Sequence, residues 1–127
     1  MKVEVSNGEL IDKVTILELK LLNIIDVEKL VNIQKEFDGL NPLLEDLFTN
    51  YSPDIQNHYL ELANLNAQLW EIEDDIRECE KNNEFGGKFV ELARSVYITN
   101  DKRCEVKKII NVITESGFIE EKSYKNY

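Results

Sequence analysis

Six polar side chains occupy helical positions that we expect to be buried, and their types could bind an anion or move a proton. On helical wheels of about 100° per residue, each falls inside the apolar stripe of its segment. These residues are Glu18, Asn66, Glu73, Arg77, Asn100 and Arg103. A charge buried alone costs several kcal/mol, so such groups must pair, ionise abnormally or meet water. They therefore form the candidate site of this chain.

The spacing of these residues predicts how they pair. Glu73 and Arg77 are one helical turn apart and can form a local ion pair. Asn66 should lie opposite Arg103 if their two helices form an antiparallel hairpin. Glu18 needs a partner from another helix, and we expect an arginine to supply it. The chain has only three arginines, and two of them, Arg77 and Arg103, lie on core stripes.

Two interpretations of this polar set stay open. A buried polar layer can fix helix register without any further role. Alternatively, the residues line a solvent-filled pocket between helices that holds a small anionic ligand. In that case Arg77 and Arg103 would supply charge-assisted donors, Asn66 and Asn100 would orient the ligand, and a glutamate would balance the charge.

An enzyme is the rival class of function. Glu18 or Glu73, if desolvated, could act as a general base with a raised pKa. A more specific form of this enzyme hypothesis is a metal-dependent phosphohydrolase that binds Mg²⁺ or Mn²⁺ through an acidic run. The carboxylates of this run belong to Glu71, Asp74, Asp75 and Glu78. Glu71-x-x-Asp74 resembles half of the motif of helical pyrophosphatases, but no second carboxylate pair faces it, so we favour a solvated face and expect no bound metal. A third possibility is a structural oligomer.

The elements that must position these residues are helices. Ser6 followed by Glu9 is a capping box, which predicts a helix from about Asn7 to about Asn23. Its polar side, which we expect to face solvent, carries Glu9, Asp12, Lys13 and Lys20. Asp26 can cap a second helix. We expect that helix to be interrupted near Gly39–Pro42 and to resume briefly from Leu43 to Phe48.

Two long helices should follow. Ser52 can cap the third helix with Pro53 at its first position, and this helix should extend to about Asn82. Gly86 and Gly87 mark a turn, and the fourth helix should run from about Gly87 to about Glu115. The fold class is therefore all-α, an antiparallel bundle of two helical hairpins. We expect residues 1–127 to form a single domain, with a loosely ordered tail at 117–127.

Composition narrows the classes of partner. The formal net charge of −10 repels nucleic acids and anionic lipid surfaces, so we expect neither as a partner.

Two observations favour a location in the cytoplasm. The first residues lack the apolar stretch of a signal peptide, and Cys79 and Cys104 should lie too far apart to form a disulfide. No Gly-rich phosphate loop is present and we expect no cofactor. Homodimerisation through exposed apolar patches, or another protein partner, stays open.

Four segments are similar to a family of small bacterial and phage proteins known only as a domain of unknown function. They are Ser6–Glu18, Leu69–Arg77, Ala93–Arg103 and Glu120–Tyr124. The resemblance implies an all-helical domain, sometimes found beside carbohydrate or envelope biosynthesis proteins, and implies no activity. The matching motif residues here are Glu18, Trp70, Glu73, Arg77, Arg94, Tyr97, Asn100 and Arg103. This set overlaps the polar residues found on apolar helix faces.

Overall fold

The computed structural model describes residues 1–127 and confirms the all-helical prediction. Its elements are α1 (Asn7–Asn23), α2 (Val27–Tyr51), α3 (Gln56–Lys81) and α4 (Gly87–Ile113), and it has no strand. The pairs α1/α2 and α3/α4 form two helical hairpins, and α1 also contacts α3 and α4. None of the four helices is both long enough and apolar enough to cross a membrane.

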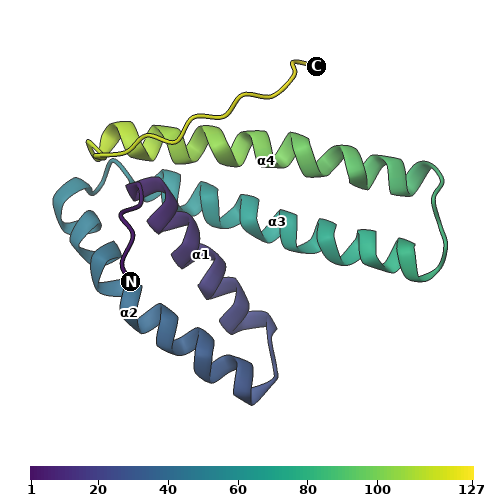
Figure 1. Ribbon diagram of the computed structural model, residues 1–127, viewed down its shortest axis with the longest axis horizontal. Coiled ribbons are helices and arrows are strands. Elements are labelled where there is room, and N and C mark those ends of the chain that lie inside the picture. Colours follow the sequence, from purple (N-terminus) through teal and green to yellow (C-terminus); the bar gives the residue numbers. More distant parts are fainter.

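The two hairpins meet at one end and diverge from there, so that the molecule is V-shaped (Figure 1). The hydrophobic core lies where they meet. It is built from Leu10, Ile11, Val14, Leu44, Ile55, Leu62, Leu65, Val106 and Ile110. These residues come from the start of α1 and α3 and from the end of α2 and α4, except Ile55, which directly precedes α3. Consequently, the closed ends of both hairpins project away from the core.

Side-chain caps start the first two helices as predicted. The Ser6 hydroxyl oxygen accepts a hydrogen bond of 3.1 Å from the backbone N–H of Glu9. Asp26 accepts from the backbone N–H groups of Glu28 and Lys29, at 3.0 and 3.3 Å. In a full capping box the Glu9 carboxylate would accept a hydrogen bond from the backbone N–H of Ser6. Here the Glu9 carboxylate contacts Lys107 instead.

The predicted break in the second helix is wrong. α2 continues from Val27 to Tyr51 with Pro42 inside it. Proline removes one backbone donor and disfavours a helix interior. However, Phe37, Leu40, Leu47 and Phe48 pack against the core from both sides of Pro42. Burial of this apolar stripe therefore outweighs the local preference.

The predicted start of the third helix is also wrong. Ser52 ends α2, with its backbone N–H bonded to the carbonyl of Phe48, and the Ser52–Pro53 peptide bond is cis. A short turn follows, and α3 begins at Gln56, three residues later than expected. Ile55 has no exposed surface, so this turn serves to place it in the core.

The α3/α4 turn lies where it was predicted. Residues 82–86 connect the helices, and Asn83 adopts a positive φ of 53°, a conformation that asparagine tolerates. Cys79 and Cys104 are both free. Residues 117–127 run in an extended conformation along α4 (Figure 1), where Lys108 pairs with Glu121 at 2.9 Å.

Candidate functional site

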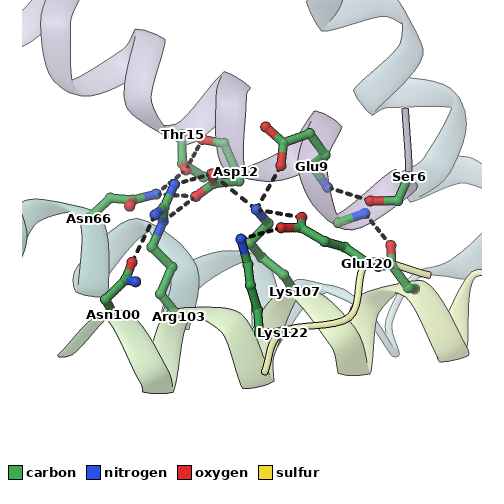
Figure 2. A network of polar contacts seen from close by, with 12 residues as sticks. Ser6, Glu9, Asp12, Thr15, Asn66, Asn100, Arg103, Lys107, Glu120 and Lys122 are labelled. Carbon is green, nitrogen blue, oxygen red and sulfur yellow. Dashed lines mark hydrogen bonds and ion pairs between the residues drawn. The ribbon is translucent and has the colours of Figure 1, made fainter. Parts of the chain in front are cut away.

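Asp12 lies at the centre of a network that joins three helices (Figure 2). Only 1% of this α1 residue is exposed. Its Oδ1 accepts a hydrogen bond of 2.9 Å from Arg103 Nε on α4, and its Oδ2 accepts a second one from Arg103 Nη2. The amide of Asn66 on α3 donates to Oδ1 at 2.9 Å. Asp12 and Arg103 thus form a two-point charged contact, the strongest kind available to a carboxylate.

Neutral side chains complete the network. The amide nitrogen of Asn66 also donates to the Thr15 hydroxyl oxygen at 2.9 Å, and that hydroxyl donates to the carbonyl of Asp12 at 2.7 Å. Asn100 accepts from Arg103 Nη1 at 3.1 Å. Burial lowers the pKa of Arg103, but its hydrogen bonds to Asp12 and the charge of that carboxylate outweigh burial and raise it. Arg103 therefore stays charged.

A second cation, which is buried, extends the network toward the C-terminal tail. Lys107 is 8% exposed, and its Nζ lies 2.6 Å from a Glu9 oxygen and 3.7 Å from Asp12 Oδ2. Glu120 in the tail approaches the same Nζ at 3.5 Å and is paired with Lys122 at 2.5 Å (Figure 2). Burial lowers the pKa of Lys107, but the hydrogen bond to Glu9 and the nearby carboxylates raise it overall.

Helices α1 and α4 cross closely beside this network. The backbone N–H of Gly8 donates to Asn111 Oδ1 at 2.6 Å. A Cβ at Gly8 would lie 2.5 Å from the Lys107 carbonyl oxygen, closer than Cβ atoms approach non-bonded atoms in proteins. The Asn7 side chain donates to the Thr114 hydroxyl oxygen at 2.9 Å. Only glycine fits here, so Gly8 allows the close approach of α1 to α4 one helical turn before Asp12.

An open groove lies beside the network, at the point where α1 diverges from α3. Its volume is about 370 Å³. Its lining comprises Ile16, Leu19, Asn66, Leu69, Trp70, Glu73, Asp74, Arg77 and Arg103. Asn66 and Arg103 therefore belong to the network on one side and to the groove on the other.

With this geometry established, the chain can be compared with known proteins. The model of a family of unknown function, DUF6165, matches residues 1–127. The chain belongs to this family. The expected relationship to a domain of unknown function is thereby confirmed. No curated protein and no solved structure matches the chain.

Three of the six sequence-predicted site residues, Asn66, Asn100 and Arg103, come together in the network. Glu73 and Arg77 pair with each other at 2.5 Å, as their spacing predicted. Their expected burial is wrong, because their side chains are 50% and 72% exposed. α1 has already diverged from α3 at this level (Figure 1), so no helix covers that part of the apolar face.

Glu18 has a partner on another helix, but the expected arginine is wrong. The hydroxyl of Tyr59 on α3 lies 2.6 Å from both Glu18 carboxylate oxygens. The Tyr59 ring meets Phe48 edge-on, with ring centroids 5.2 Å apart. Burial raises the pKa of Tyr59, and the hydrogen bond to Glu18 and its charge raise it further. Glu18 thus contributes to packing of α1 on α3 and does not line the groove.

The sequence interpretation missed Asp12 as a site residue, because it placed this side chain on the solvent side of the first helix. One signal could have revealed it. Gly8, Asp12 and Thr15 follow one another at helical spacing and are all short side chains. Such a stripe indicates close approach by another helix, which here is α4.

The acidic run on α3 does not assemble into a metal centre. Glu71, Asp74, Asp75 and Glu78 are all exposed. No group of three or more His, Cys, Asp or Glu side chains is placed so that it could hold a metal ion. The geometry therefore offers no support for the phosphohydrolase alternative.

Proposed function

We propose that this chain is a binding module and that its binding site is the groove between α1 and α3. The ligand would be a small molecule that joins an anionic group to an apolar or aromatic part. The observation that carries the proposal is that two arginines, a tryptophan and several apolar residues line the same groove. Arg77, Arg103 and Trp70 all line the groove, with Ile16 and Leu69 beside them.

The size and chemistry of the groove suit such a ligand. Small-molecule sites are typically about 300–1,000 Å³, mostly apolar, with a few convergent polar groups. The groove, at about 370 Å³, is at the lower end of that range. Trp70 offers an aromatic face for stacking, and a guanidinium can bind a carboxylate or a phosphate at two points.

Arg103 is prepared for this role by the network behind it. An arginine side chain has five N–H donors, and Arg103 uses three of them within the protein, two toward Asp12 and one toward Asn100. Two donors are left for a ligand, and the side chain is 24% exposed. Because protein contacts already fix the Arg103 guanidinium, ligand binding would cost little side-chain entropy at this residue.

Arg77 would supply the second cation. Its only partners are the Glu73 carboxylate and the Glu73 carbonyl, one turn away on the same helix. An exposed pair of this kind contributes only about 0–1 kcal/mol, so a ligand anion can replace Glu73 at low cost. In the groove, two arginines offset Glu73 and Asp74, so the local charge is balanced although the chain carries −10.

The polar residues would therefore have different roles. Arg77 and Arg103 would contact the ligand anion, and Asn66 would present a carbonyl oxygen that has no partner within the chain. Asn100 would act through Arg103, which it holds in place. Catalysis is the weaker proposal. Of the two glutamates considered as a general base, only Glu73 lines the groove, and it is half exposed rather than desolvated.

Fluorescence provides the test, because Trp70 is the only tryptophan. The protein would be titrated with aromatic and aliphatic carboxylates, nucleotides and sugar phosphates while Trp70 emission is followed. We expect at least one class to give a saturable change. Arg77→Ala should weaken that binding by at least about tenfold, the worth of one charge-assisted contact.

Arg94→Ala is the matched control. Arg94 is an exposed arginine on α4 outside the groove, so its loss changes net charge equally. We expect it to leave binding unchanged. Equal weakening by both substitutions, or no response of Trp70 to any compound, would contradict the proposed function.

A further inference from the structure

The closed end of the α1/α2 hairpin has apolar residues without a core to bury them. Seven of the thirteen residues from Lys20 to Asn32 are aliphatic, and none of these thirteen residues is buried. The last buried residue of α1 is Leu17, and the first of α2 is Ile33. No other helix reaches this hairpin end, since it projects away from the core (Figure 1).

Four of these residues are largely exposed. Leu22 is 83% exposed, Ile25 92%, Val27 74% and Val31 63%. Isolated apolar residues on a surface need no explanation, but a contiguous apolar patch marks an interaction site. These residues lie in the last turn of α1, in the short connection and in the first turns of α2, so all four are gathered at one end of the hairpin.

The surface area of the chain points to a macromolecular partner. A compact monomer of 14.8 kDa is expected to expose about 7,000 Å². This chain exposes 8910 Å², so the excess is roughly 1,900 Å². The extended tail and the two projecting hairpin ends are exposed segments of the chain (Figure 1). A stable protein interface covers about 800 Å² on each partner, which the excess can supply.

The local charge identifies the kind of partner. A twofold interface brings one patch against its own copy, so it tolerates little net charge. Over residues 20–32, Lys20 and Lys29 balance Asp26 and Glu28, which gives a net charge of zero. The chain as a whole carries −10. The hairpin end is therefore a surface on which two copies can meet without repulsion.

We propose that the α1/α2 hairpin end, residues 20–32, is a homodimer interface in which two copies of this chain pack around a twofold axis. Leu22, Ile25, Val27 and Val31 of each copy would form its apolar centre. This proposal does not depend on ligand binding in the groove. The two proposals are tested separately, because dimerisation is measured by mass and ligand binding by Trp70 emission. Failure of one proposal therefore does not contradict the other.

Sedimentation velocity of the full chain over a concentration series tests the interface. We expect a species of twice the 14.8 kDa chain mass to accumulate with concentration. Ile25→Glu should raise the dimer dissociation constant by at least about a hundredfold, because it places one unpaired carboxylate from each copy in the apolar centre of the interface. Because Ile25 lies outside both helices and is 92% exposed, the Ile25→Glu variant should have the same circular dichroism spectrum as the wild type.

Val90→Glu is the control. Val90 is a 52% exposed aliphatic residue at the closed end of the other hairpin, and its replacement adds the same charge. It should leave dimerisation intact. The proposal is overturned by a wild type that stays monomeric at every concentration, by Ile25→Glu that dimerises normally, or by equal loss in both variants. A monomer that binds neutral lipid vesicles would also overturn it, by assigning the hairpin end to a membrane surface.

Discussion

Replacing Asp12 with asparagine should strongly destabilise the fold. The substitution keeps the shape of the side chain but removes its charge. Asp12 accepts two hydrogen bonds from Arg103 and one from Asn66, and it lies 3.7 Å from Lys107 Nζ. In Asp12→Asn these donors meet an amide that has only one acceptor oxygen. Arg103 then loses its counter-charge.

The expected magnitude follows from burial. Breaking a buried ion pair by removing one partner costs about 3–5 kcal/mol. Asp12 is 1% exposed, but the Arg103 side chain is 24% exposed, so water can solvate part of the released charge. We therefore expect a loss near the lower limit, about 3 kcal/mol. For 127 residues the unfolding entropy is about 0.27 kcal/mol/K, so the melting temperature should fall by roughly 11 °C.

Urea unfolding followed by far-ultraviolet circular dichroism measures this effect. The midpoint should move while the slope stays unchanged, which shows that stability and not the unfolded state has changed. Asp75→Asn serves as control, because Asp75 is an exposed α3 residue with no side-chain contact, and it should change stability by less than about 0.5 kcal/mol.

A double-mutant cycle separates the ion pair from other effects of the substitution. Arg103→Met alone leaves the Asp12 carboxylate buried without its main partner. In the double variant Asp12→Asn/Arg103→Met, both charges are gone. We expect the double variant to be at least about 2 kcal/mol more stable than the sum of the single losses predicts. Additive losses, or a cost of Asp12→Asn below about 1 kcal/mol, would refute the view that this pair holds the three helices together.

Two further predictions concern the same helix junctions. Gly8→Ala should destabilise the protein by about 2 kcal/mol, because its Cβ would force α1 away from the Lys107 carbonyl. Gly39→Ala should instead stabilise it by about 0.5–1 kcal/mol, because alanine favours the helix interior and its Cβ would meet no side chain and no other part of the chain within 4 Å. Thermal unfolding of both variants checks these opposite signs, and equal signs would contradict the close crossing. Stability should also fall as pH rises above 10.0, the ordinary pKa of tyrosine, because unfolded Tyr59 releases its proton there while the raised pKa in the folded protein retains it. Tyr59→Phe should show a shallower fall in urea titrations above that pH, and parallel curves for the two proteins would contradict the expectation.

Local signals predicted the helices where no tertiary contact opposed them. Ser6 and Asp26 cap α1 and α2 as their positions indicated. Pro42 and Pro53 show the limit of such signals. Pro42 sits inside a helix because the residues around it are needed in the core. Pro53 does not start a helix, because the chain turns there to bury Ile55. In both cases the free energy of burying apolar surface outweighs the local preference of the chain. A local sequence pattern does not show which residues tertiary packing will bury.

The polar site was harder to predict for a geometric reason. A helical wheel assumes that a helix has one buried side, but α1 packs against α2 on one side and against α3 and α4 on another. Asp12 faces that second contact and is therefore buried on what looked like the polar side. The opposite error occurred at Arg77. Its face of α3 is apolar in pattern, yet α1 diverges before it can cover that face.

Arg103 is the residue at which a structural and a binding role meet, and this decides which substitutions are informative. Its Nε and Nη2 hold Asp12 inside the network, and the same side chain lines the groove together with Trp70. Removing Arg103 would destroy the network and the groove together, so loss of ligand binding in that variant would not distinguish the two roles. Arg77 has no such double role, because its only partner is an exposed glutamate one turn away. Binding that depends on Arg77 but not on Arg94, in a protein of unchanged stability, is therefore the result that would assign a function to the groove.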